Sequence, residues 1–561
     1  MGGFAPPARS GRRRYKRYIQ MKQMLAFVAA LSFATAALAA PPKAMAPMKG
    51  AGESGAAPTG VFAGQSARST GTVTVEGHKI AYEAVAGTIV VHPKGWDDAA
   101  KPQGAKDAIG TADGPPVAAM FYVAYFKQGE DSRTRPVTFL YNGGPGSSTV
   151  WLHMGAFGPV RVVTSNDSHT PPAPYGAVNN AYSLLDASDL VFIDAPGTGF
   201  SRIEGKNKEK AFYGVDQDGY AFSDFIAQFL SKYGRWNSPK YLFGESYGTP
   251  RSAVLIHDLE SERAIDFNGV ILLSQILNFD LAADQPDTNP GVELPYAIAL
   301  PTFAATAWYH HLLDSQPPDL ESFLHEVEQF AMGDYMHALE QGANLAEDQF
   351  NAIAAKLHDY TGLSLAYIKK ANLRVGGAQF EQELQSDSDL TTGRLDSRFS
   401  GPSMDPLGEY ADYDPQAASI SSAYVSVFNG YVRQTLHYNT AESYDPESGT
   451  VNNSWQLKHQ PPGAPFPVPI SVNVMPDLAS AMKYDPKLKI CLNGGYFDLA
   501  TPFFEGMYEM HHLQIPANLQ SNIEYHYYQS GHMVYANEAS LKQLHDNVAA
   551  FIRKTDNQAG G

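Results

Sequence analysis

The sequence predicts an α/β fold with a central, mostly parallel β-sheet and a mostly helical insertion. Two strongly apolar segments, 189–202 and 267–277, have the continuous hydrophobic character of strands that are buried on both faces. Between them, the apolar residues of 221–236 recur with the period of a helix. Such an alternation is typical of a parallel sheet whose strands are connected by helices. The pattern then becomes charged and helical from about residue 304 to residue 384, which indicates a mostly helical insertion over 301–440.

The first 39 residues predict an export signal rather than a part of the fold. The segment 21–39 has a lysine, a short apolar run and an Ala-Leu-Ala end, which are the three parts of a secretory signal peptide. Its apolar run is too short and too rich in alanine for a membrane span, so we expect no stable membrane insertion. The basic GRRRYKR upstream either extends the signal or precedes a true start at Met21 rather than Met1.

Composition and charge limit the kinds of molecule that the exported chain can bind. Residues 40–70 are rich in Pro, Ala, Gly and Ser, which predicts a flexible linker. The formal net charge of −17 becomes −24 without residues 1–39, because that segment holds seven Lys and Arg residues and no acids. A surface this acidic repels nucleic acid and anionic membranes, so we exclude both as partners.

The chain has a single cysteine, Cys491, so it cannot form an intramolecular disulfide. An exported chain without disulfides favours a bacterial periplasm or the cell exterior over a eukaryotic secretory pathway. The residue itself is expected to be a small buried side chain in a strand.

The α/β core is predicted in two parts, 71–300 and 441–561, on either side of the insertion. Strands are marked by β-branched and aromatic residues between Gly and Pro breaks, and helices by the 3.6-residue period. Within the insertion, residues 385–420 are expected to be loop-like. The expected strands are 72–91, 120–126, 136–141, the start of 189–202, 240–243, 267–277, 487–498 and 522–532, and the core helices are 221–236, 249–260 and 540–555.

A serine stands between two glycines in the stretch GESYG, 244–248, where a predicted strand gives way to a predicted helix. Glycines allow a turn so tight that the serine hydroxyl is pushed out over the sheet, above a helix N-terminus. This context favours Ser246 as a nucleophile over an ordinary turn serine.

A nucleophilic serine needs a base, and the base needs an orienting acid. In this architecture the chain order is serine, acid, histidine, with each partner in a loop after a late strand. Of the 17 histidines, His532 follows Gly531 after a strand, whereas His526 lies inside that strand and is expected to pack. Asp498 ends the strand 487–498, so we predict Asp498 and His532 as the partners of Ser246.

The tetrahedral intermediate of an acyl transfer needs backbone amide donors. One is expected from Tyr247, directly after the nucleophile, and the other from an early glycine-rich loop. The stretch NGGPG, 142–146, follows a predicted strand and supplies that loop. The alternative of a phosphate-binding loop is disfavoured, because no Lys-Ser/Thr pair follows. We predict no metal and no cofactor.

Five motifs together resemble those of the serine carboxypeptidases, in the same order: NGGPGSS, IDAPGTGFS, GESYGTP, Gly-x-x-Asp-x-x-x-Pro over 495–502, and GHMV. The resemblance runs from about residue 120 to the C-terminus. It implies an α/β-hydrolase whose insertion forms a lid over the cleft. It also implies a role for each residue: Ser246 as nucleophile, His532 as general base, Asp498 as its orienter, Gly144 and Tyr247 as oxyanion donors, and Asn142, Gly143 and Glu245 as ligands of the substrate's terminal carboxylate.

The implied role explains an acid directly before the nucleophile. A deprotonated Glu245 would repel a carboxylate, whereas a protonated one donates a hydrogen bond to it. Peptide hydrolysis is therefore expected at acidic pH. Three departures from the family pattern bear on this site: Ser147 replaces a usual cysteine, Leu140 a usual tryptophan, and Ala156 the acid that usually shares a proton with the residue at 245. The loss of that acid leaves the pH optimum open.

The sequence thus predicts a serine-type carboxypeptidase that acts on peptides with a free C-terminus. Two other hypotheses remain: an esterase or acyltransferase with the same three residues, and an inactive binding scaffold. Residue preference and oligomeric state are not predicted.

Overall fold

The structure is a computed structural model that describes residues 62, 64–96, 112, 114–284, 286–467 and 471–557. The predicted signal, 1–39, and most of the predicted linker, 40–70, lie outside the described residues. The last part of that linker prediction is wrong, because strand β1 begins at Ser66 and pairs with Gly87 of β2. Within the described part of the chain, no helix is both long enough and apolar enough to cross a membrane.

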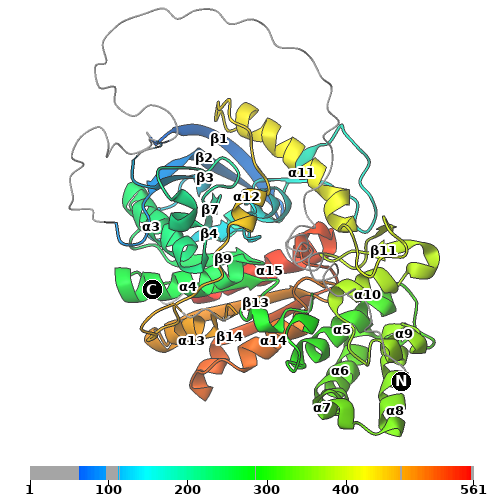
Figure 1. Cartoon of the computed structure of the whole chain (residues 1–561). Coiled ribbons are helices and arrows are strands. Elements are labelled where there is room, and N and C mark those ends of the chain that lie inside the picture. Colours follow the sequence, from blue (N-terminus) through cyan, green and yellow to red (C-terminus); the bar gives the residue numbers. More distant parts are fainter. Residues whose placement is uncertain are drawn as a thin grey trace, which may run out of the picture.

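The core is one ten-stranded sheet in the order β1-β2-β3-β7-β4-β9-β10-β13-β14, with β8 paired to β3 (Figure 1). Strands β7 to β14 along this path are parallel, and β1 to β3 form an antiparallel extension. The predicted α/β class is confirmed. The strands are β1 (Ser66–Val75), β2 (His78–Val91), β3 (Val117–Lys127), β4 (Val137–Tyr141), β7 (Asp189–Ile193), β8 (Arg202–Glu204), β9 (Lys240–Glu245), β10 (Gly269–Leu273), β13 (Lys489–Gly495) and β14 (Ile523–Tyr528).

Helices cover both faces of the parallel strands, which is why β4, β7 and β10 are buried along their whole length. Successive strand residues point to opposite faces. Leu242 belongs to the core under α3 and α4, and Phe243 to the core under α15. Cys491 is buried in β13, as predicted. The helices of the core are α2 (Lys208–Phe212), α3 (Val215–Tyr233), α4 (Gly248–Arg263), α12 (Gly449–Asn453), α13 (Met475–Tyr484), α14 (Phe503–His511) and α15 (Glu538–Thr555).

Helices α5 to α10 of the insertion gather on one side of the sheet, around a third apolar core that includes Phe497 and Phe503 (Figure 1). Helix α11 lies apart from them and packs against the core under α15. The bounds predicted for this insertion, 301–440, stay a prediction. Its elements are α5 (Leu294–Tyr309), α6 (Leu320–Phe330), α7 (Met336–Gln341), α8 (Glu347–Thr361), α9 (Leu365–Lys370), α10 (Gly377–Glu383), β11 (Leu390–Thr392), β12 (Ser400–Pro402) and α11 (Pro415–Gln434).

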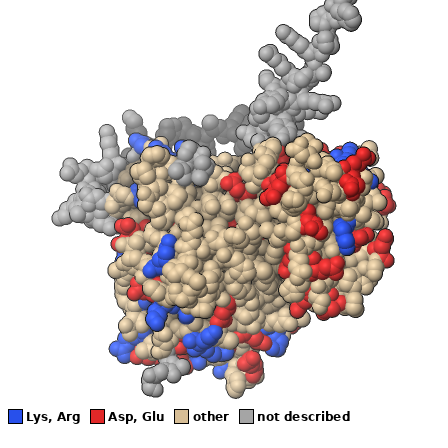
Figure 2. All heavy atoms as spheres, turned by 90° about the horizontal axis from the view of Figure 1, so that it is seen from below, with Lys and Arg blue, Asp and Glu red and all other residues tan. Residues whose placement is uncertain are grey.

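The loop predicted at 385–420 is only partly a loop. A short hairpin, β11 and β12, lies within it, and α11 begins at Pro415. The Asp414 carboxylate caps this helix by accepting hydrogen bonds from the amides of Gln416 and Ala417. A proline in the first turn and an acidic cap are strong helix starts. Figure 2 shows acidic side chains gathered on the side of the molecule where the insertion helices lie in Figure 1.

Candidate active site

Ser246 lies at the turn between β9 and α4, as predicted, with a φ of 58°. This left-handed conformation is strained for a serine and is typical of functional turns. The flanking glycines are required by space. A Cβ on Gly244 would lie 2.1 Å from the Gly248 carbonyl oxygen, and one on Gly248 would lie 2.9 Å from that of Tyr141. The tight turn therefore presents Ser246 at the carboxyl edge of the sheet.

His532 and Asp498 form a buried pair. The Nδ1 atom of His532 is 2.8 Å from Oδ2 of Asp498, and the two residues are 4% and 0% exposed. The other Asp498 oxygen accepts hydrogen bonds from the amides of Ala500 and Thr501, at 2.9 and 3.0 Å. Burial lowers the pKa of His532, but the charge and hydrogen bond of Asp498 outweigh burial and hold that pKa above its ordinary value. With Nδ1 held by the carboxylate, Nε2 is left to exchange a proton with a substrate or nucleophile.

The sheet order explains how distant segments meet. Strands β4, β9, β10, β13 and β14 are consecutive neighbours and parallel, so their carboxyl ends share one edge. That edge opens into a cavity of about 490 Å³. Asn142, Gly143, Gly144, Glu245, Ser246 and His532 line it, whereas Asp498 lies behind His532.

The glycine-rich loop lies against the nucleophile turn. A Cβ on Gly143 would be 2.3 Å from the backbone nitrogen of Tyr247 and 2.8 Å from the carbonyl oxygen of Glu245. Only glycine allows the two backbones to approach this closely. Gly144 has a φ of 107°, which also favours glycine. The amides of this loop and of Tyr247 are thus brought together, as an oxyanion site requires.

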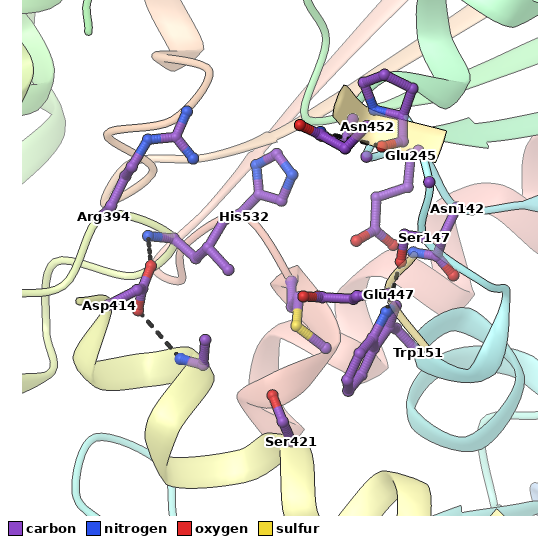
Figure 3. A pocket seen from close by; sticks show the side chains of 18 of the residues that line it. Asn142, Ser147, Trp151, Glu245, Arg394, Asp414, Ser421, Glu447, Asn452 and His532 are labelled. Carbon is purple, nitrogen blue, oxygen red and sulfur yellow. Dashed lines mark hydrogen bonds between the residues drawn. The ribbon is translucent and has the colours of Figure 1, made fainter. Parts of the chain in front are cut away.

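Glu245 is 2% exposed and lies beside Asn142 in the cavity (Figure 3). The Tyr535 hydroxyl donates to both Glu245 oxygens, at 3.1 and 2.9 Å. Burial raises the pKa of Glu245 to about 7, although the charge of His532 and the hydrogen bonds of Tyr535 and Asn142 oppose that rise. The carboxyl is therefore easily protonated near neutral pH.

Tyr535 was not found by sequence reasoning. It lies three residues after His532, in the segment between β14 and α15, and its position is made possible by Gly155. A Cβ on Gly155 would be 2.7 Å from the Tyr535 ring. The neighbouring Ala156 is fully buried. The absence of a side chain at Gly155 thus leaves space for a phenol against Glu245, where the sequence predicted a missing acidic partner.

Two further supports of the site come from residues that no motif singled out. The fully buried guanidinium of Arg251 on α4 donates to the Asn142 carbonyl at 2.7 Å and pairs with Asp218 of α3 at 2.6 Å. Trp151 lines the cavity and donates its Nε1 hydrogen to Ser147 Oγ at 2.8 Å. Leu140 stands at the position where serine carboxypeptidases usually have a tryptophan, and it is buried in β4. Trp151 nevertheless supplies an indole beside the glycine-rich loop from another position in the sequence.

Among the described residues, no group of three or more His, Cys, Asp or Glu side chains is arranged to hold a metal ion. What the arrangement provides is a serine on a strained turn, a buried histidine–carboxylate pair, clustered backbone amides and a buried carboxyl beside an amide side chain. Such a set can perform acyl transfer and can recognise an acidic group next to the reacting carbonyl.

Comparisons with known proteins agree with this description. The family model described as Serine carboxypeptidase matches residues 111–545. Serine carboxypeptidase-like 36 and 33 of Arabidopsis thaliana are 26% identical over 178 residues and 29% identical over 212 residues. The matches cover 30% and 35% of this chain and 34% and 39% of the two relatives, so the chain spans little more than a third of their length.

Among solved structures, a prohormone-processing carboxypeptidase from Saccharomyces cerevisiae, Kex1(delta)p, is similar with a TM-score of 0.49 and 15% identity. The match covers 84% of this chain and 91% of that one. The family model spans far more than half of the chain. The chain belongs to the serine carboxypeptidase family.

Proposed function

We propose that the protein is a serine carboxypeptidase that releases C-terminal residues from peptides through an acyl-enzyme on Ser246. The observation that carries the proposal is one cavity that contains Ser246, the His532 of a buried His–Asp pair, and Glu245 with Asn142. The first group of residues performs acyl transfer, and the second recognises a carboxylate. Their proximity supports an exopeptidase over an esterase with the same nucleophile.

In the proposed reaction, Ser246 Oγ attacks the carbonyl of the last peptide bond while His532 Nε2 accepts its proton. Asp498 holds the imidazole through Nδ1 and stabilises the imidazolium. The amides of Gly144 and Tyr247 donate to the oxyanion. His532 then gives the proton to the leaving amine, and a water molecule, activated by the same imidazole, releases the shortened peptide from Ser246.

Asn142, the Gly143 amide and Glu245 bind the terminal carboxylate in this proposal. Glu245 serves this role when protonated, because it then donates a hydrogen bond to the anion. Since the pKa of Glu245 is about 7, the protonated form persists into a pH range where an ordinary glutamate is ionised. Hydrolysis of free peptides should therefore decline only above about pH 7. The leader 1–39 supports export to the periplasm or the cell exterior.

The test is turnover of matched peptides with free and amidated C-termini, followed by mass spectrometry from pH 5 to pH 9. We expect stepwise loss of C-terminal residues from the free peptide, a slower reaction of the amidated peptide at pH 5, and a decline above pH 7 for the free peptide alone. Ser246→Ala should abolish both reactions while the fold is retained. Equal cleavage of the two peptides at every pH would reject carboxylate recognition.

A further inference from the structure

The cavity holds an excess of acidic groups that the proposed reaction does not use. Its lining includes five carboxyl side chains and, among Lys and Arg residues, a single guanidinium, that of Arg394. Arg394 forms two parallel hydrogen bonds with Asp284, at 2.9 and 2.7 Å, so its charge is already matched. Asp414 accepts hydrogen bonds from the amides of Leu395, Gln416 and Ala417. Glu245 is used by the proposed carboxylate site. Of the five described carboxyl side chains, only those of Glu381 and Glu447 are left without a role in the reaction or a structural partner that explains them.

Glu381 is only 4% exposed, and within the described part of the chain its Oε1 atom has no hydrogen-bond partner. Burial raises the pKa of this carboxyl well above its ordinary value, and the nearby Asp284 and Asp414 act in the same direction, whereas Arg394 opposes them. A buried polar group without a partner is costly unless a ligand supplies one. Because Glu381 lines the cavity, a ligand there can supply the missing hydrogen-bond partner.

Glu447 points into the cavity beside Trp151 (Figure 3). Within the described residues, no hydrogen bond or ion pair engages its carboxylate, and the side chain is open to the cavity. The side chain is exposed and, in the described part of the chain, unpaired, so it is available to a charged group of a ligand that enters the cavity.

The backbone places Glu447 next to the proposed carboxylate site. Glu447 forms an antiparallel bridge with Ser147, whose amide donates to the Gly143 carbonyl at 3.1 Å. Trp151 is held beside the same residue, because its Nε1 atom donates a hydrogen bond to Ser147 Oγ. Glu447 and Trp151 thus flank the loop whose other end, at Asn142 and Gly143, binds the terminal carboxylate in the proposed reaction.

We infer that Glu447 and Trp151 form a subsite for a cationic side chain, lysine or arginine, on the C-terminal residue of the substrate. This inference rests on the proposed function, because it assigns the side chain next to the bound carboxylate. The indole packs against the aliphatic stem and attracts the cation, and the carboxylate pairs with the ammonium or guanidinium.

The experiment compares kcat/KM for peptides that differ only in the last residue, which is lysine, arginine, methionine or glutamate. Methionine matches the stem of lysine without its charge. We expect the wild-type protein to prefer lysine and arginine over methionine by about tenfold, the scale of one charge-assisted hydrogen bond, and to disfavour glutamate. Glu447→Gln should remove most of that preference and leave the methionine peptide within about twofold, and Glu447→Lys should favour glutamate.

Glu347→Gln, on an exposed face of α8 outside the cavity, is the matched control and should change none of the ratios. Equal loss on all four peptides in Glu447→Gln, or a wild-type preference for methionine, would overturn the subsite. If no peptide is shortened at all, the proposed function fails. The subsite is then judged by calorimetric binding of the lysine and methionine peptides to Ser246→Ala, where equal affinities reject it.

Discussion

At the scale of single residues, the proposed reaction makes the buried acid beside Ser246 the group that sets the pH dependence of the site. Glu245 receives its hydrogen bond from a phenol, Tyr535, which cannot share a proton with it as a second carboxyl would. The hydroxyl favours the ionised form of Glu245 and so lowers a pKa that burial raises. The same residue therefore both positions the carboxyl and sets the upper pH limit of its protonated form.

Tyr535→Phe removes that donor and should raise the pKa of Glu245. In the proposed reaction the protonated form binds the substrate carboxylate, so the alkaline limb of kcat/KM for a free peptide should shift to higher pH. The amidated peptide, which lacks the carboxylate, should show no corresponding shift. Tyr484→Phe, a substitution at an exposed tyrosine, is the control. Tyr535 does not act through Glu245 if the alkaline limb of the kcat/KM profile is unchanged in Tyr535→Phe, or if it shifts equally for the free and the amidated peptide.

At the scale of elements, the position of the glycine-rich loop depends on the absence of one side chain. Gly143→Ala would place a methyl group 2.3 Å from the Tyr247 nitrogen, and backbone on both sides leaves it no room. The loop must then move away from the nucleophile turn by a fraction of an ångström or more. Displacements of that size at a reacting centre cost on the order of 100-fold in rate. We expect kcat/KM to fall by about that factor for both free and amidated peptides.

Gly430→Ala is the matched control for this substitution, because a Cβ at Gly430 in α11 meets nothing within 4 Å. Circular dichroism and the unfolding midpoint separate loss of geometry from loss of fold. Near-normal turnover by a folded Gly143→Ala protein would mean that the loop does not supply the oxyanion donors.

The elements also show which parts of the molecule the sequence could predict. Strands such as β7 and β10 were predicted because burial on both faces leaves a continuous apolar run. The start of β1 was missed because SARST has the composition of a linker, and only its pairing with β2 orders it as a strand. The start of α11 had a local signal, the Asp414-Pro415 pair, within a segment otherwise rich in turn residues.

The same distinction applies to the candidate site. Ser246, Asp498 and His532 stand in motifs whose spacing along the chain reflects their chemistry. Tyr535 and Glu447 do not. Their nearness to Glu245 and Ser147 results from packing between segments far apart in the sequence, at an edge that only the sheet order defines. The residues next to Tyr535 and Glu447 in the sequence form no motif from which these contacts could be predicted.

At the scale of the whole molecule, the buried ionisable groups couple stability to pH. Burial raises the pKa of Glu245 and Glu509 to about 7 and that of Glu260 to about 8. For His459, burial lowers the pKa, but Asp216 and Asp477 outweigh it and raise the value to about 9. His153 acts in the opposite sense, with a pKa that burial lowers to about 3. Because an unfolded histidine has a pKa of about 6.5, this opposing effect is at most half a proton above pH 6.5.

Between pH 6.5 and pH 8 the folded protein therefore holds more protons than the unfolded chain, whose carboxyls have released theirs and whose histidines are at most about half protonated. Stability falls with pH wherever the folded state binds more protons, so the free energy of unfolding should decrease over this window. One such group contributes on the order of 1 kcal/mol per pH unit. The midpoint of denaturant unfolding should accordingly be lower at pH 8 than at pH 6.5. Glu260→Gln, at a buried carboxyl without a hydrogen-bond partner among the described residues, should make the decrease smaller. A midpoint that rises from pH 6.5 to pH 8 would contradict the assignment of these groups as protonated in the folded protein.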